Sequence, residues 1–116
     1  MKKLREIITY KDYFSEFLKA QPLKIQEKIA KIMGIIERVE RIPTTYLKYM
    51  EGTEGLYEIR VSLGSDIFRV FCFFDSGRLV VLLSGFQKKT QKTPKKEIDK
   101  AIRLMAEYYI DKEKER

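Results

Sequence analysis

The chain has 116 residues, of which 44% are hydrophobic and 35% are charged, and this composition predicts one domain, residues 1–116, with a core of its own. Its net charge of +7 favours a polyanionic partner such as nucleic acid, or an acidic protein. The absence of histidine and the single cysteine exclude a zinc site, histidine acid–base catalysis and an internal disulfide. No glycine pattern of the GxGxxG or Walker type supports a nucleotide-binding fold.

The N-terminus does not resemble a secretory signal, because Lys2, Lys3, Arg5 and Glu6 leave no apolar run. No stretch of the sequence approaches the apolar length that a membrane-spanning helix needs. The lone Cys72 fits a reducing compartment. We therefore expect a cytoplasmic protein without a membrane partner.

The first half of the chain predicts one strand and two helices. A strand is expected over residues 3–10 and a short helix over 12–20. Pro22 suits the start of a longer helix that ends near Ile42. Spacings of three and four residues predict one buried face on this helix, formed by Ile25, Ile29, Ile32, Ile36 and Val39. Residues 44–55 are predicted to form a loop, which carries Lys48.

Three strands are predicted next, over residues 56–63, 66–74 and 78–86. The two connections, Gly64-Ser65 and Ser76-Gly77, are two-residue turns, and such short connections force an antiparallel meander. The predicted fold class is therefore α+β, in the order β-α-α-β-β-β-α, with the helices packed on the sheet.

The last predicted element is a helix over residues 94–112, with Thr93 as its N-cap and residues 111–116 as a frayed tail. Its inner face is expected to consist of Ile98, Ala101, Ile102, Met105 and Tyr109.

The strand register predicts two arginines opposite each other on one face of the sheet. If Gly64-Ser65 is a two-residue turn, Val61 faces Phe68 and Arg60 faces Arg69. Like charges opposed across a ladder destabilise a sheet, so the pair indicates a bound anion or a neutralising acid. Glu58 lies on the same face, and a purely structural Arg–Glu–Arg cluster is the alternative to an anion site.

The same counting across Ser76-Gly77 places Ser84 beside Arg69 and Lys88 just beyond that end of the face. Lys48 is expected to join this group. After the last strand, the lysine-rich segment 87–96 predicts phosphate steering by Lys89, Lys92, Lys95 and Lys96. A basic loop that is merely solvated is the alternative for these lysines.

These residue types suit cleavage of RNA by its own 2′-hydroxyl. Arg60 and Arg69 can stabilise the pentavalent phosphorane, because guanidinium groups bind phosphate oxygens in a bidentate fork. Lys88 is a candidate for proton transfer and Glu58 is a possible base. Phe71, Phe73 and Phe86 either stack on a base or pack beneath a helix, and packing is the favoured interpretation.

The order of elements and three segments of the sequence resemble those of a known family. The order of elements is similar to that of the RelE/ParE/HigB superfamily of toxins from type II toxin–antitoxin pairs. The segments Gly55–Val61, Ile67–Val70 and Leu82–Pro94 look like its HigB-like, phage-derived branch.

The resemblance implies a RelE-like fold, no cofactor, and a ribosome-dependent endoribonuclease that cleaves messenger RNA without a metal. It implies a cognate antitoxin, often of the helix-turn-helix type, besides the ribosome and the messenger RNA as partners. The family's catalytic positions carry over to Arg60, Arg69 and Lys88. Glu58 departs from the family, since the RelE type has a basic residue there, and the last helix lacks the tyrosine that some members use near its start.

Two other functions remain open on the sequence alone. One is a ParE-like inhibitor that binds DNA gyrase and cuts nothing. The other is a non-catalytic protein of the same fold that binds only its antitoxin. One fold hosts several functions, so the fold does not choose among them.

Overall fold

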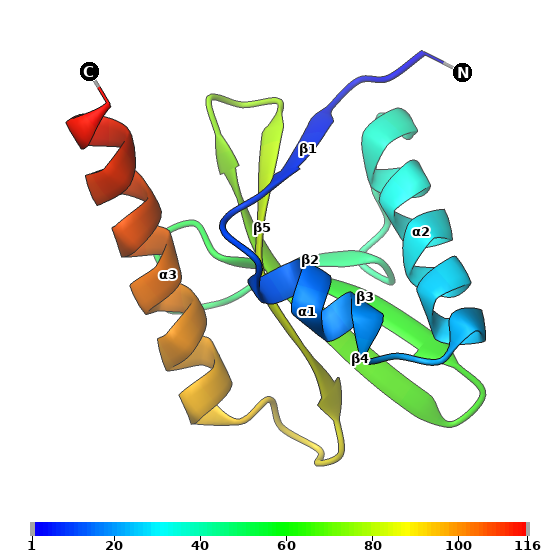
Figure 1. Cartoon of the computed structure of the whole chain (residues 1–116). Helices are drawn as coiled ribbons and strands as arrows, with labels where there is room; N and C mark the ends of the chain where they lie inside the picture. The colour runs from blue at the N-terminus through cyan, green and yellow to red at the C-terminus, as the bar shows by residue number, and fades with distance from the viewer. Residues whose placement is uncertain (1, 116) are drawn as a thin grey trace.

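The computed structural model describes residues 2–115 and places one mixed sheet between helices (Figure 1). Strand neighbours follow the order β1-β5-β4-β3-β2. The elements in chain order are β1 (Glu6–Thr9), α1 (Tyr13–Lys19), α2 (Leu23–Arg38), β2 (Leu47–Tyr49), β3 (Tyr57–Leu63), β4 (Asp66–Asp75), β5 (Leu79–Lys88) and α3 (Lys95–Lys114).

The predicted α+β class and the antiparallel meander of β3, β4 and β5 are confirmed. The sheet is larger than the meander, because β1 pairs in parallel with β5 and β2 pairs with β3. The loop predicted over residues 44–55 is therefore wrong in part, since it contains β2. This strand has only three residues, which is too short for strand alternation to be recognised in the sequence.

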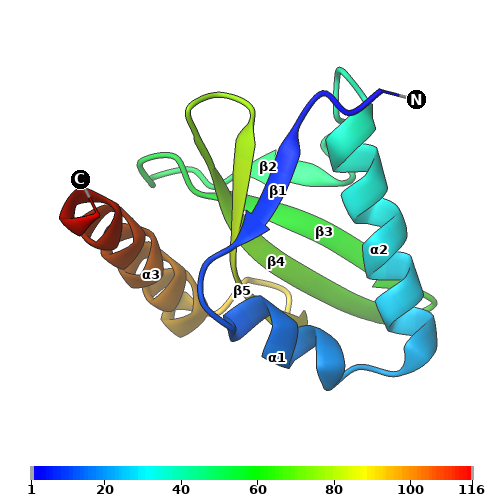
Figure 2. The same cartoon turned by 45° about the horizontal axis from the view of Figure 1, so that its top comes forward.

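Helices α1 and α2 cover one face of the sheet, and Figure 2 shows α2 in front of the ends of β3 and β4, with α1 below β4. The predicted apolar face of α2 is confirmed by Ile25, Ile29, Ile32 and Ile36, which are all buried. They pack against Ile59, Val61, Phe68, Val70, Cys72, Val80 and Leu82 of the sheet. The helix ends at Arg38 rather than near Ile42, because Val39 already adopts an extended backbone.

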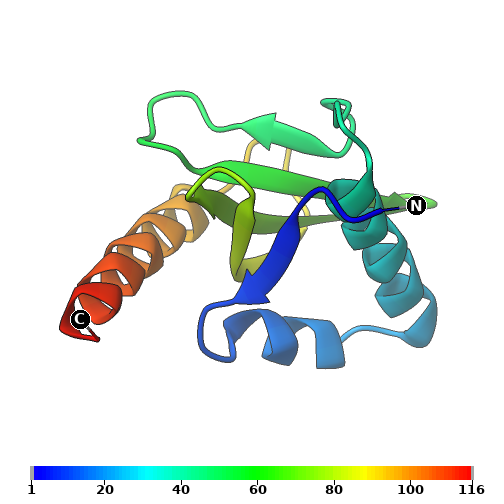
Figure 3. The same ribbon diagram turned by 90° about the horizontal axis from the view of Figure 1, so that it is seen from above.

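Helix α3 covers the opposite face, and Figure 3 shows α2 and α3 at opposite ends of the sheet. Its deepest residues are Ala101 and Leu104, which pack with Phe71, Phe73, Val81 and Leu83. The predicted inner face is correct for Ala101 and for the partly buried Ile98 and Met105. It is wrong for Ile102 and Tyr109, which are 39% and 44% exposed. No helix of the described residues is both long enough and apolar enough to cross a membrane.

Gly85 of β5 lies directly against the Phe17 ring of α1. A β-carbon added at this glycine would lie 2.5 Å from the ring of Phe17, far inside contact distance. The missing side chain therefore allows α1 to lie directly on β5.

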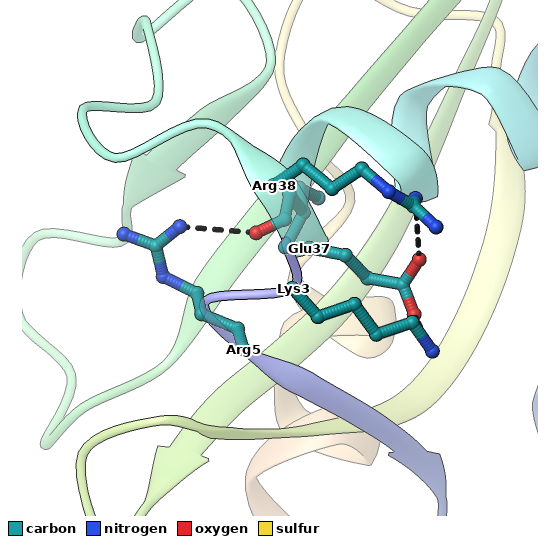
Figure 4. Close-up of polar contacts among 5 residues, drawn as sticks. Lys3, Arg5, Glu37 and Arg38 are labelled. Carbon is teal, nitrogen blue, oxygen red and sulfur yellow. Dashed lines mark hydrogen bonds and ion pairs between the residues drawn. The ribbon is translucent and has the colours of Figure 1, made fainter. Parts of the chain in front are cut away.

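The N-terminal segment is tied to the end of α2 (Figure 4). The Arg5 guanidinium donates hydrogen bonds to the carbonyl oxygens of Ile36, Val39 and Glu40. These include carbonyls that the helix terminus leaves without an internal partner. Glu37 pairs with Lys3 and Arg38 beside them, so the start of the chain is fixed although β1 has only four residues.

The C-terminal half of α3 is fixed by a buried carboxylate, so the predicted fraying is wrong as far as the described residues reach. Tyr108 and Lys112 each donate a hydrogen bond of 2.7 Å to Asp75, and Tyr10 donates one to Asp111. The hydrogen bonds from Lys112 and Tyr108 lower the pKa of Asp75. Arg116 lies outside the described residues.

Candidate active site

The predicted register between β3 and β4 is confirmed, and Arg60 lies directly opposite Arg69. By strand alternation, both arginines project from the same face of the sheet as Glu58 and Phe71. Helix α3 covers this face where it packs on Phe71 and Phe73. Helix α3 begins only at Lys95, so this end of the face is less fully covered.

Glu58 lies between the two arginines. Its Oε1 atom is 3.5 Å from Nε of Arg60 and 3.3 Å from Nε of Arg69. The Thr93 hydroxyl donates to its other oxygen over 3.4 Å. The Arg–Glu–Arg cluster, which the sequence offered as the alternative to an anion site, is therefore present. In it, one carboxylate pairs with two guanidinium groups.

The two arginines differ in access to solvent. The side chain of Arg69 is 7% exposed, whereas that of Arg60 is 31% exposed. Arg69 also donates a hydrogen bond to the carbonyl oxygen of Phe68. Burial lowers the pKa of Arg69, and the nearby Glu58 carboxylate opposes that change. A ligand that approaches the pair therefore meets Arg60 first.

Arg60 and Arg69 line a cavity of about 450 Å³ at the free edge of β3, where β2 has ended. Its wall contains a third cation, Lys28 of α2, together with the hydroxyl-bearing residues Thr45, Tyr46 and Ser62. No local pattern in the sequence points to these residues, because Lys28 resembles many other surface lysines and Tyr46 lies in a stretch predicted as loop. The cavity combines positive charge with hydrogen-bond donors, as an anion site requires.

The predicted pairing of Ser84 with Arg69 is wrong, since Phe86 lies opposite Arg69. The turn after Asp75 has three residues instead of two, and a bulge in β5 near Ser84 adds a further residue. Together the longer turn and the bulge move the partner of Arg69 by two residues, from Ser84 to Phe86. Because side chains alternate with a period of two, the partner remains on the same face of the sheet. The Phe86 ring lies 5.7 Å from that of Phe71 in a stacked arrangement.

Of the three aromatic residues considered as base platforms, Phe71 and Phe73 are buried beneath α3. Packing, the favoured interpretation, is confirmed for these two. Phe86 is half-buried and packs against the same cluster.

Lys88 is the last residue of β5 and pairs with Ile67. It opens into a second cavity, of about 700 Å³, which the arginines do not line. Ile67 contributes to the walls of both cavities, so Lys88 and the arginine pair flank this one side chain. Lys48 lies on β2 rather than in a loop, directly opposite Glu58, so the structure brings it to the cluster.

The remaining predicted lysines, Lys89, Lys92, Lys95 and Lys96, are all exposed. Lys95 forms an ion pair of 2.8 Å with Asp99 on the surface of α3. The prediction of Thr93 as N-cap is wrong: Pro94 occupies that position, and no side chain caps the helix. Thr93 instead joins the cationic segment to Glu58. Within residues 2–115, no cluster of possible metal ligands is present.

The sequence and the fold are both similar to those of known proteins. Residues 16–106 match the model of a family described as phage derived protein Gp49-like (DUF891). Among curated proteins, no sequence is significantly similar to the chain.

Two solved structures share the fold. The first is the archaeal RelE–RelB complex from Pyrococcus horikoshii OT3, with a TM-score of 0.52, 18% identity, and alignment over 70% of this chain and 91% of that one. The second is the RelB–RelE antitoxin–toxin complex from Methanococcus jannaschii, with a TM-score of 0.53, 15% identity, and coverage of 75% and 99%.

Proposed function

Because the chain belongs to the Gp49-like family of phage-derived proteins and has a RelE-like fold, we propose that it is the toxin of a toxin–antitoxin pair and cleaves messenger RNA on the ribosome. The observation that carries this proposal is the arginine pair. Two guanidinium groups opposed across a ladder, with a third cation at the same cavity, suit a phosphate in transfer.

The proposed reaction needs no metal. The 2′-oxygen of the RNA attacks the adjacent phosphorus, the bond from phosphorus to the 5′-oxygen breaks, and a 2′,3′-cyclic phosphate and a 5′-hydroxyl result. Arg60 and Arg69 stabilise the negative charge that develops on the phosphorane oxygens. Lys88, across Ile67, gives a proton to the leaving oxygen.

Glu58 is the carboxylate at hand to accept the proton of the 2′-hydroxyl. Its two oxygens are held by Arg60, Arg69 and Thr93. A phosphate that takes over the guanidinium groups would release the carboxylate, so binding of the substrate and activation of the base are coupled.

The proposed partner that controls the activity is a cognate antitoxin, as in the two RelE–RelB complexes of the same fold. A helix-turn-helix antitoxin is our expectation. The exposed lysines 89, 92, 95 and 96 are proposed to steer the ribosome-bound RNA, because such charges accelerate encounter with a polyanion.

A second candidate function is a non-catalytic protein that binds only its antitoxin. The observation in its favour is again Glu58, which already neutralises part of the charge that a catalytic pair would present. It predicts that induction of the protein leaves transcripts intact.

The decisive experiment is induction of the protein followed by mapping of messenger RNA 5′ ends. We expect new ends at codon-dependent positions and arrested growth, and we expect both to disappear in Arg60→Ala and Arg69→Ala. Arg103→Ala is the matched control, because it removes the same charge from an exposed position of α3.

Circular dichroism and thermal melting of each purified variant show whether it folds, which matters most for the buried Arg69. Folded variants at both positions that still cut RNA and arrest growth would rule out the arginine site. Intact transcripts accompanied by DNA damage would point to a gyrase inhibitor instead.

A further inference from the structure

The cavity beside Lys88 contains a carboxylate that a phosphate site does not need. Asp66 begins β4 and is exposed within this cavity, among Lys88, Lys89, Gln87 and Gln91. A negative group at this place repels the backbone of a nucleic acid. Its presence therefore calls for a ligand with hydrogen-bond donors as well as phosphates.

Asp66 and Gln87 form a small hydrogen-bonding row. The Nε2 atom of Gln87 donates to Oδ1 of Asp66 over 3.4 Å, and both side chains are exposed. The strand register sets this geometry, because Gln87 lies opposite Phe68 and Asp66 precedes Phe68 by two residues on the same face. Throughout residues 2–115, no lysine or arginine forms an ion pair with Asp66.

The row offers one donor followed by two acceptors. The second amide hydrogen of Gln87 is the donor, and the two carboxylate oxygens of Asp66 retain free lone pairs. Guanine presents the complementary row along its Watson–Crick edge, with the O6 acceptor beside the N1–H and N2–H donors. Cytosine offers the same row as the protein, and uracil and adenine each mismatch it at one position or more.

We propose that the cavity beside Lys88 binds one unpaired guanine base of an RNA strand, read by Asp66 and Gln87. Lys88 and Lys89 neutralise the phosphates on either side of that nucleotide. The side chain of Ile67 lines both this cavity and the arginine cavity, so the two cavities adjoin at one end of the sheet. By strand alternation Asp66 and Gln87 project from the face opposite to Arg60 and Arg69, so the RNA strand that carries the guanine passes around this end of the sheet to reach the arginines. The inference rests on the proposed function and names one base of the RNA that the protein prefers.

The test is fluorescence anisotropy of the purified protein with labelled single-stranded hexanucleotides. The RNAs are UUUGUU, the same strand with inosine for guanine, and UUUUUU. We expect the guanine strand to bind at least about fivefold more tightly than the uridine strand, the lower end for one base-edge contact. Inosine lacks the 2-amino donor, so its affinity should fall between the two.

Asp66→Asn should bring the guanine and uridine strands to equal affinity, because an amide replaces one acceptor with a donor. Asp12→Asn is the matched control, an exposed aspartate at the start of the chain's first helix, and it should keep the wild-type preference. Equal binding of both strands by the wild type, no measurable binding of either, or an unchanged preference in Asp66→Asn would overturn the proposal.

This outcome is separate from that of the proposed function. A guanine preference in a protein that leaves cellular transcripts intact supports the base pocket and contradicts the nuclease. Cuts in messenger RNA without a guanine preference in binding support the nuclease and contradict the pocket.

Discussion

The single carboxylate of Glu58 partly neutralises both guanidinium groups of the candidate site, those of Arg60 and Arg69. It is buried, and its Oε1 atom is within 3.5 Å of both guanidinium groups. Removing such a partner leaves two cations in close proximity, which an incoming phosphate would neutralise.

For Glu58→Gln we therefore expect opposite effects on binding and on catalysis. RNA binding should tighten, because one negative charge is removed, whereas cleavage should fall by about 100-fold or more if Glu58 accepts the proton. Anisotropy with a hexanucleotide and mapping of 5′ ends measure the two effects. Glu27→Gln on the exposed side of α2 controls for the change in net charge. Full cleavage by the Glu58→Gln variant would assign Glu58 a structural role only.

At the scale of the elements, the two hairpins differ in how well the sequence predicts them. The β3–β4 turn has the Gly-Ser pair of a two-residue hairpin, with Gly64 at positive φ. Pairing the residues on either side of this turn one by one therefore predicts the Arg60–Arg69 pair correctly. The β4–β5 hairpin has a longer turn and a bulge, and strand alternation contains no signal for an inserted residue. Local sequence patterns also cannot predict that Lys28, from a distant segment, lines the cavity of Arg60 and Arg69.

Helix α3 shows the same limit. Its amphipathic pattern predicted a helix correctly, but Leu104 was missed on the buried face and Tyr109 was wrongly assigned to it. Tyr108 and Lys112 face β4, where both donate hydrogen bonds to Asp75, and these bonds join residues more than thirty positions apart.

These hydrogen bonds predict the pH dependence of stability. The pKa of Asp75 lies below its ordinary 3.8, so its contribution is present above that pH and is lost as the pH falls through the lowered value. Burial and Asp75 raise the pKa of Tyr108 to about 12, so its contribution is complete below pH 10 and is lost between there and 12.

Asp75→Asn should accordingly destabilise the protein at neutral pH by about 1–3 kcal/mol and flatten the acid limb below about pH 4. Urea unfolding at a series of pH values measures both effects. Asp99→Asn, which removes an exposed ion pair with Lys95, should cost less than about 1 kcal/mol. A wild-type acid limb in the Asp75→Asn variant would show that Asp75 does not hold α3.

At the scale of the molecule, the net charge of +7 predicts binding that weakens with salt. For about three phosphate contacts on single-stranded RNA, affinity should fall roughly tenfold to thirtyfold between about 50 and 200 mM salt. Lys89→Ala should reduce the logarithmic slope by about 0.7, the share of one phosphate contact. Lys24→Ala, an exposed lysine on α2, should leave it unchanged. Equal slopes for both variants would place Lys89 outside the RNA path.

The parallel pairing of β1 with β5 also has a consequence for biosynthesis. Glu6 pairs with Leu79 and Thr9 pairs with Leu82, so β1 cannot join the sheet before β5 has been synthesised. Closing so long a loop costs chain entropy, and folds that depend on such distant contacts form slowly. The apolar face shared by Leu83 and Leu104 is completed later still, by α3. The chain therefore reaches its folded form only after nearly all of it has been synthesised.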